Sequence, residues 1–213
     1  QQLSQLQAKR ERQLLNAPPL TPAHSSQGVL AQLQTVLPFR LTAAQQRVVR
    51  EIASDLGRAT PMHRLLQGDV GSGKTIVAVL AMLRSVEAGA QAALMAPTEI
   101  LAMQHFFYFK KLLSKLGYVI IPLTGSNTAK EKMQLKKLAA AGLAHIVVGT
   151  HALLEDDVEF AKLGLAIVGG GRVGLFRGEV ANRHPAVKWI GLAEKNPNET
   201  VSIIRSWLHE QAA

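Results

Sequence analysis

The residues best suited to chemistry lie together in one stretch, residues 68 to 75, which reads GDVGSGKT. The stretch fits the phosphate-binding loop pattern G-x-x-x-x-G-K-[ST] at every fixed position. Its glycines allow backbone N–H groups to close around phosphate oxygens in conformations that a Cβ would forbid. Lys74 has the charge and reach for the β- and γ-phosphates, and the Thr75 hydroxyl is a ligand for Mg²⁺. The residues expected to hold the nucleotide are Gly68, Asp69, Gly71, Ser72, Gly73, Lys74 and Thr75.

The elements predicted around this stretch support the same interpretation. A short strand over 62–67 enters the loop, and a buried helix over 76–86 leaves it. The helix would point the positive end of its dipole at the phosphates. The alternative, a glycine turn between a strand and a helix, matches the pattern by chance in about one such chain in a hundred. The stretch therefore predicts a nucleotide-binding site, with ATP and Mg²⁺ as its cofactors.

Composition narrows the class of protein. A chain of 213 residues allows one sizeable domain, or one domain with appendages. No apolar run has transmembrane length, and the first residues, QQLSQLQAKRERQ, are too polar for a signal peptide. The chain has no cysteine, which excludes disulfides and cysteine-ligated metal. A cytoplasmic, nucleotide-dependent protein without membrane contact is expected.

The formal net charge of +9 suits a polyanionic partner, although a basic, soluble surface would give the same value. Aromatic residues make up 5% of the chain, so extensive base stacking is not expected. If nucleic acid is bound, contacts to phosphates should dominate.

After the phosphate-binding loop, strands and helices alternate. Helices are expected over 43–56, with Thr42 as N-cap, and over 99–116 and 128–141; strands are expected over 91–95, 118–123, 145–148 and 163–168. Such alternation predicts an α/β fold, in which a parallel sheet carries helices on both faces and ligands bind at the carboxyl ends of the strands.

Polar residues immediately follow three of the predicted strands, at 97–99, 124–126 and 149–151. Because the carboxyl ends of parallel strands share one edge, these loops and the phosphate-binding loop should form a common surface. Short hydroxyl side chains and helix N-termini suit a sugar-phosphate backbone and do not require base recognition.

These residues match a known family. The chain resembles the first motor domain of superfamily-2 helicases, most closely the RecG branch-migration helicase. The resemblance rests on LTAAQ (41–45), GDVGSGKT (68–75), MAPTEILA (95–102) with Gln104 and His105, and VGTHAL (148–153). It implies a RecA-like fold, a role for Gln45 in contacting adenine, and phosphate and Mg²⁺ roles for Lys74 and Thr75. It also implies a DNA-strand path along Thr98, Thr124, Gly125, Thr150 and His151. For His151, a structural role beneath its loop is an equal alternative.

The resemblance implies three parts. Residues 1–37 match the linker helices that join an upstream wedge domain to the motor, and 38–168 match the motor domain itself. Residues 169–213 diverge. In the family an acidic pair after the strand at 163–168 holds Mg²⁺ and positions the attacking water. This chain has Gly169, Gly170 and Gly171 there, which leaves Asp69 as the nearest acid. We therefore expect weak ATP binding and poor hydrolysis.

The divergent tail predicts one more element, an amphipathic helix over 196–210 that begins with a capping box. The wording AEKNPNETVSIIRSWLHE resembles the C-terminal tail of the flagellar M-ring protein FliF, a partner-binding helix. Packing of the helix on its own sheet is the alternative.

Three functional classes remain open. The first is an ATP- and DNA-binding motor domain of a RecG-like helicase acting in recombination and repair. The second is a non-catalytic nucleotide-binding scaffold whose C-terminal helix binds a protein. The third is a small-molecule P-loop NTPase or kinase, for which the sequence offers no substrate lid.

Overall fold

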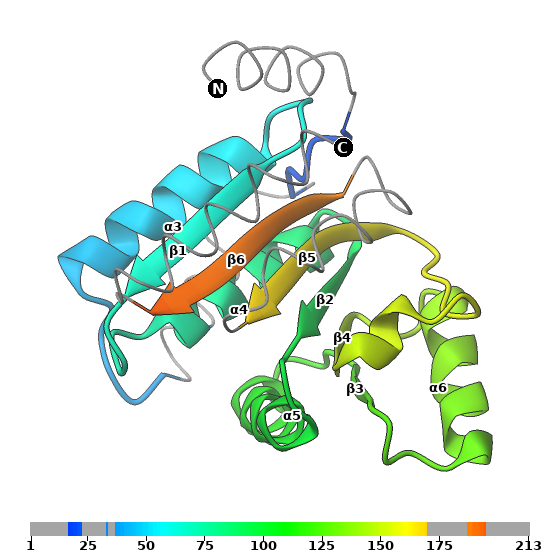
Figure 1. The fold of residues 1–213 in the computed structure, drawn as a ribbon. Coiled ribbons are helices and arrows are strands. Elements are labelled where there is room, and N and C mark those ends of the chain that lie inside the picture. Colours follow the sequence, from blue (N-terminus) through cyan, green and yellow to red (C-terminus); the bar gives the residue numbers. More distant parts are fainter. Residues whose placement is uncertain (1–16, 23–32, 34–36, 170–186, 195–213) are drawn as a thin grey trace, which may run out of the picture.

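Six parallel strands form a single sheet in the computed structural model, which describes residues 17–22, 33, 37–169 and 187–194 (Figure 1). The order across the sheet is β1-β6-β5-β2-β4-β3. The strands are β1 (His63–Gly68), β2 (Gln91–Met95), β3 (Ile120–Leu123), β4 (Ile146–Gly149), β5 (Leu163–Gly169) and β6 (Lys188–Glu194). Because every pairing is parallel, all six carboxyl ends lie at one edge. The predicted α/β, RecA-like architecture is confirmed.

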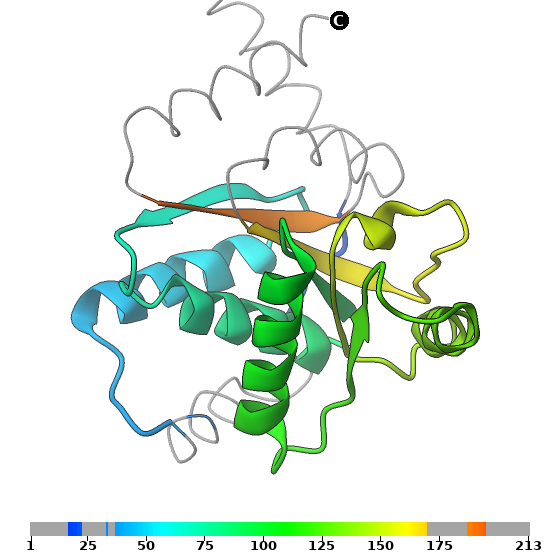
Figure 2. The ribbon, with the colours of Figure 1, turned by 60° about the horizontal axis from the view of Figure 1, so that its bottom comes forward.

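Helices cover both faces of the sheet (Figure 2). The helices α3 (Ala43–Leu56), α4 (Lys74–Glu87) and α5 (Glu99–Leu113) contribute to one hydrophobic core. The helix α6 (Ala129–Ala140) and the 3₁₀ helix η1 (His151–Leu154) contribute to the core on the opposite face. Strand residues alternate between these two cores, as in Ala92 and Ala93 of β2, because successive side chains in a strand point to opposite faces.

The central helix α4 explains why the phosphate-binding loop is held firmly. Ten of its fourteen residues are buried, and it packs against α3, β2 and β5. A helix that is apolar around most of its circumference is stable only inside a core. The loop that precedes α4 is therefore fixed between a sheet strand and a fully packed helix.

Helix caps follow the sequence closely. Thr42 caps α3 in a capping box with Gln45, and Thr128 caps α6 in a capping box with Glu131. Thr98 caps α5 through a bond from the backbone N–H of Leu101 to its Oγ1 at 3.3 Å. Each cap satisfies backbone donors that a helix start leaves free.

Two buried polar side chains tie distant segments together. Gln91 is 4% exposed; its Nε2 donates to the carbonyls of Ala139 and Ala144 at 2.9 and 2.8 Å. Lys188 is fully buried, and its Nζ donates to the carbonyls of Arg58 and Thr60, each at 2.7 Å. Burial lowers the pKa of Lys188. Strand β6 is thus pinned to the segment that precedes β1.

The strand β6 was not predicted. It belongs to the segment predicted to be a divergent tail, and it lies between β1 and β5. The division of the chain at residue 169 stays a prediction. Most of the predicted linker helices in residues 1–37, and the predicted helix at 196–210, lie outside the described residues. Residues 17–22, from the predicted linker, pack beside α3: the Leu20 N–H donates to the Leu56 carbonyl at 2.8 Å.

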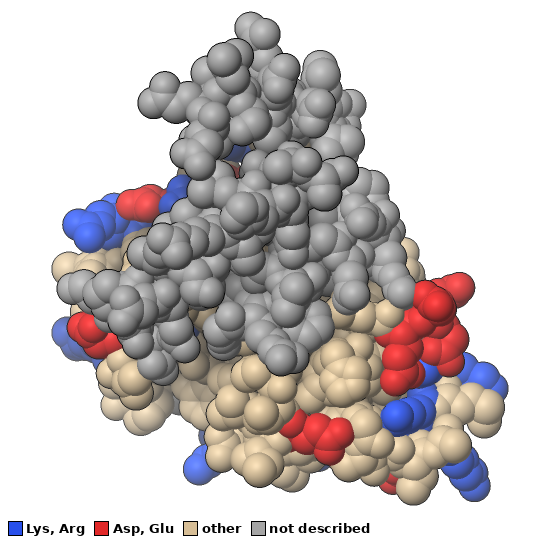
Figure 3. Space-filling model, in the orientation of Figure 1, with Lys and Arg blue, Asp and Glu red and all other residues tan. Residues whose placement is uncertain are grey.

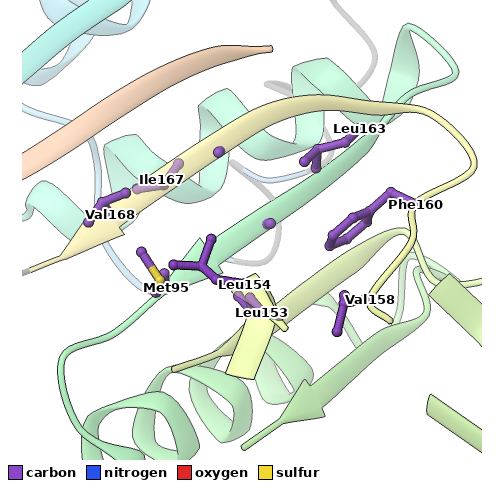
Figure 4. A pocket seen from close by; sticks show the side chains of 10 residues that line it. Met95, Leu153, Leu154, Val158, Phe160, Leu163, Ile167 and Val168 are labelled. Atoms are coloured by element: carbon purple, nitrogen blue, oxygen red, sulfur yellow. The ribbon is translucent and has the colours of Figure 1, made fainter. Parts of the chain in front are cut away.

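A small cavity of about 30 Å³ lies between η1 and the sheet (Figure 4). Its lining is apolar and includes Met95, Leu153, Val158, Phe160 and Val168. A space of that size holds about one water molecule, and an apolar lining offers a water no partners. The cavity is a packing gap beneath the loop that carries His151. In the described part of the chain, no helix combines the length and apolar character needed to span a membrane.

Candidate nucleotide and nucleic-acid site

The phosphate-binding loop begins at Gly68, the last residue of β1, and ends at Gly73, the N-cap of α4. Gly71 and Gly73 have φ of 78° and 83°, a left-handed conformation that glycine adopts without steric cost. The Nζ of Lys74 donates to the carbonyls of Gly68 and Asp69, each at 2.8 Å. The loop therefore curls around its own lysine, which places a cation at the start of the α4 dipole.

Gln45 braces this loop from the neighbouring helix. Its Nε2 donates to the carbonyl of Ser72 at 3.0 Å, while its Oε1 accepts from the backbone N–H of Thr42 at 2.9 Å. A Cβ at Gly73 would collide with the Gln45 amide. The predicted adenine-contacting residue thus lies directly against the loop, and one amide serves both the α3 cap and the loop.

The donor set fits a metal that is held mainly by the nucleotide. Thr75 follows Lys74 in the first turn of α4 and is partly exposed, and the nearby Asp69 is exposed. Among the described residues no group of three or more His, Cys, Asp or Glu side chains could hold a metal ion. Mg²⁺ retains several waters and usually takes one or two protein ligands plus phosphate oxygens, which matches the Thr75 hydroxyl.

The predicted nucleic-acid residues lie at the same edge of the sheet but on a different part of it. They follow β2, β3 and β4, which are adjacent strands in the order β2-β4-β3. The phosphate-binding loop follows β1, at the other end of the sheet. The edge therefore carries two regions separated by β6 and β5, one for the nucleotide and one made of the loops after three adjacent strands.

Two of the three loops touch each other. Thr98 is exposed at the start of α5, and Gly125 is exposed in the turn before α6. A Cβ at Gly125 would meet the end of the Glu99 side chain, so the turn before α6 lies against the first residue of α5. The loop after β2 and the turn after β3 are thus adjacent, and the roles of Thr98 and Gly125 in binding DNA stay a prediction.

Thr124 and Thr150 are buried rather than displayed. Thr124 is fully buried, and its Oγ1 lies 2.9 Å from the Ser126 Oγ, while its backbone N–H donates to the Asn127 Oδ1 at 2.8 Å. Thr150 is 2% exposed, and its Oγ1 has no hydrogen-bond partner. The groups that these loops present to solvent are Gly125, Ser126 and His151.

His151 is exposed at the start of η1, and the segment after η1 is tied to α6. The Nζ of Lys136 donates to Glu155 at 2.7 Å and to Asp157 at 2.5 Å. The hydrogen bond from Lys136 lowers the pKa of Asp157. Figure 3 shows charged side chains of both signs gathered at the α6 end of the molecule. Lys136 thus joins α6 to the segment that follows η1, and we call this pair of ion pairs the α6 brace.

No acidic residue directly follows β5 in the sequence. Gly169 is its last residue, and no carboxylate occurs in the sequence from Val168 until Glu179. Strand β6, between β1 and β5, ends at Glu194, whose backbone is in register with Gly68. No sequence signal marked this position, because the register depends on a strand pairing across more than a hundred residues.

Comparisons with known proteins agree with this geometry. The chain is 53% identical over 132 residues to ATP-dependent DNA helicase RecG of Aquifex aeolicus, which covers 62% of this chain and 17% of that protein. It is 45% identical over 174 residues to RecG of Mycobacterium bovis, which covers 76% of this chain and 24% of that protein. The chain thus spans less than a third of the length of these relatives.

Solved structures show the same fold. A structure of RecG bound to a three-way DNA junction superposes with a TM-score of 0.79 at 35% identity, covering 94% of this chain and 27% of that one. An ATP-dependent RNA helicase from Sulfolobus tokodaii, described as hypothetical, superposes with a TM-score of 0.59 at 16% identity, which shows the fold alone. It covers 84% of this chain and 54% of that chain. The family model for DEAD/DEAH box helicases matches residues 42–168. With this match over more than half of its length, the chain belongs to the DEAD/DEAH box helicase family.

Proposed function

We propose that this chain is the ATP- and DNA-binding motor domain of a RecG-like, ATP-dependent DNA helicase that acts in recombination and repair. The observation that carries the proposal is the Gln45 brace on a complete phosphate-binding loop. A glycine turn would need neither a lysine held by two loop carbonyls nor an amide that joins the loop to a separate helix.

ATP binding depends on the Lys74 ammonium in this proposal. A charged hydrogen bond contributes about 1.5–3 kcal/mol, so Lys74→Ala should weaken binding of a fluorescent ATP analogue about 10- to 150-fold. Lys130→Ala, an exposed lysine on α6, is the matched control and should bind as the unmodified chain does. Unchanged affinity in Lys74→Ala would favour a scaffold in which the loop no longer binds nucleotide.

Mg²⁺ is assigned to the Thr75 hydroxyl and the nucleotide phosphates. When bound, the ion neutralises phosphate charge. Thr75→Val removes the hydroxyl and keeps the branched shape. It should therefore reduce the difference in ATP-analogue affinity measured with and without Mg²⁺.

Hydrolysis by the chain alone should be poor, because glycines stand where the family has its acidic pair. Phosphoryl transfer depends on a carboxylate near the metal and on an arginine usually supplied by a partner domain. A phosphate-release assay with and without DNA measures this. DNA-stimulated turnover at the rate of a complete helicase would contradict the expectation.

DNA is proposed to lie along the loops after β2, β4 and β3, with the sugar-phosphate backbone as the recognised feature. Gly125, Ser126 and His151 are exposed there, and Thr98 stands at a helix N-terminus. Contacts to phosphates release counterions, so affinity for branched or duplex DNA should fall steeply as salt rises. An enzyme acting on a small molecule would show no such slope.

A further inference from the structure

The outer side of α5 carries four of the nine large hydrophobic side chains that are exposed in the described part of the chain, and the proposed function leaves them unexplained. Four residues of this helix are exposed large hydrophobics: Ile100, Leu101, Phe107 and Tyr108. Ile100 and Phe107 are seven residues apart, as are Leu101 and Tyr108, so the four lie on one side of the helix. Contiguous exposed apolar patches mark interaction sites in soluble proteins.

The aromatic residues in this patch are concentrated and firmly backed. The chain has six Phe, two Trp and two Tyr, and four of these are the consecutive residues 106–109. Phe106 and Phe109 face the core, at 8% and 0% exposed, whereas Phe107 and Tyr108 are 59% and 39% exposed. The Phe107 ring lies 5.3 Å from that of Phe106, and the Tyr108 ring lies 6.0 Å from that of Phe109. Two of the four rings are therefore buried in the core, and the other two are exposed to solvent.

The charges at the C-terminal half of the patch are all positive. Lys110, Lys111 and Lys115 are exposed at the C-terminal end of α5, and the helix has no acidic residue after Glu99. Lys110 also lies over the Phe106 ring, with its Nζ 5.6 Å from the centroid. Aromatic rings beside a row of lysines suit a ligand that offers both flat apolar surfaces and negative charge.

The patch is continuous with the proposed DNA surface. The helix starts at Thr98, on the loop after β2, and Phe107 follows about 13 Å further along the axis at a rise of about 1.5 Å per residue. That distance corresponds to about four base steps of DNA at about 3.4 Å per step. A DNA arm held at Thr98 therefore reaches the two exposed rings.

We propose that the outer side of α5 binds unpaired bases of branched DNA, with Phe107 and Tyr108 as stacking surfaces and Lys111 and Lys115 as phosphate contacts. This rests on the proposed function and adds a second region to the DNA-binding surface. Stacking on aromatic side chains tolerates any base, because every base has a flat face. The site therefore distinguishes unpaired from paired DNA and is indifferent to sequence.

The test measures binding of the 213-residue chain to two fluorescent three-way junctions by anisotropy at fixed salt. One junction has a single-stranded thymidine arm, and the other is fully paired. Stacking contributes about 1–3 kcal/mol per base, which corresponds to about 5- to 150-fold in affinity. Phe107→Ala/Tyr108→Ala should lose at least fivefold on the junction with the unpaired arm and less than twofold on the paired junction. Phe107→Trp/Tyr108→Trp should retain the preference.

Two controls separate the possible outcomes. Leu143→Ala removes an exposed apolar side chain far from α5 in the sequence and should change neither affinity. Lys111→Ala/Lys115→Ala should weaken both junctions and lower the salt slope. If the double alanine variant bound both junctions as the unmodified chain does, or lost the same affinity for both, the stacking role would be wrong. The patch would then be assigned to a protein partner. Failure of the unmodified chain to bind either junction would overturn the proposed function itself.

Discussion

The amide of Gln45 performs two tasks that a single substitution can separate. Its Oε1 accepts the Thr42 N–H and completes the α3 capping box, whereas its Nε2 donates to the Ser72 carbonyl in the phosphate-binding loop. A glutamate has nearly the same shape and accepts hydrogen bonds but cannot donate them. Gln45→Glu should therefore preserve the cap and remove the brace.

The expected changes in stability and in ATP affinity of Gln45→Glu follow from these two hydrogen bonds. Glutamate is a favoured third residue of a capping box, and a negative charge near a helix N-terminus is stabilising, so the free energy of unfolding should not fall. Loss of one neutral hydrogen bond corresponds to about 0.5–1.5 kcal/mol. Because binding must then order a looser loop, affinity for ATP should fall about 2- to 12-fold. Charge repulsion between the new carboxylate and the phosphates adds to the loss.

The assay is a titration with a fluorescent ATP analogue, paired with urea unfolding of each variant. Gln45→Ala removes both bonds and should lose affinity together with about 0.5–1 kcal/mol of stability. Gln46→Glu is the matched control, because the Gln46 Nε2 also donates to a backbone carbonyl at 3.0 Å, that of Leu41, away from the loop. It should bind ATP as the unmodified chain does.

Two results would refute this reasoning. The first is normal affinity in Gln45→Glu, which would show that the brace does not order the loop. The second is an equal loss in Gln46→Glu, which would assign the effect to α3 in general. A companion titration with a GTP analogue tests the adenine role that the resemblance implies. If Gln45 only braces the loop, its substitution should weaken binding of both nucleotides equally. If Gln45 also contacts the base, the substitution should weaken binding of ATP more.

Three further predictions concern the loop, the α6 brace and β6. Gly73→Ala should abolish ATP-analogue binding and cost about 1–2 kcal/mol in urea unfolding, because its φ is 83° and the new Cβ meets the Gln45 amide. The hydrogen bond from Lys136 holds the pKa of Asp157 below its usual value. The stability contributed by this bond is therefore fully present above the usual pKa of Asp157, and it is lost as pH falls through the lowered pKa. Acid unfolding should therefore show a smaller loss of stability below pH 3.8 in Lys136→Met than in the unmodified chain. Lys188→Met leaves two carbonyls without a donor and should destabilise by about 1–3 kcal/mol near neutral pH. The pKa of Lys188 is lowered in the folded state, so the unfolded state binds more protons between that lowered pKa and pH 10.5. The unmodified chain should therefore gain stability relative to this variant as pH rises through that window.

Local chemistry explains which elements could be predicted from the sequence. Helix α3 begins and ends where expected, since Thr42 and Gln45 form a capping box and Gly57 closes the last turn. Strand β2 also matches its predicted range, because all five of its residues are buried in the sheet. In both cases the residues that set the boundaries are neighbours in the chain.

Boundaries that depend on distant partners were less accurate. The strand expected from residue 118 starts at Ile120. The N–H of Val119 donates to the Nδ1 of His145 at 2.9 Å, which takes that residue out of the regular ladder. Helix α5 was expected to reach residue 116 and ends at Leu113, followed by a turn with Gly117 at a φ of 74°.

Exposure at the site could not be predicted from position alone. Each polar cluster follows a strand, as expected, but the loop after β3 folds back so that Ser126 and Asn127 satisfy Thr124. A hydroxyl that directly follows a buried strand lies at the border of the core. Its neighbours in the turn, Gly125 and Ser126, are the groups that reach solvent.

The position of β6 changes how the phosphate-binding loop is understood. In the described sheet β1 pairs with β6 alone, and β6 joins it to β5. Without β6, β1 and β5 would stand about two strand spacings apart, close to 10 Å, with the polar backbone edges of both left unpaired. The segment around Lys188 therefore belongs to the platform that holds the phosphate-binding loop, although the chain was expected to diverge from the family after Val168. A strand in that place requires apolar side chains for both cores, which Trp189, Ile190 and Leu192 supply, and it requires no acidic pair. The platform of the phosphate-binding loop is therefore complete in the described sheet, although no carboxylate occurs in the sequence from Val168 to Gly178.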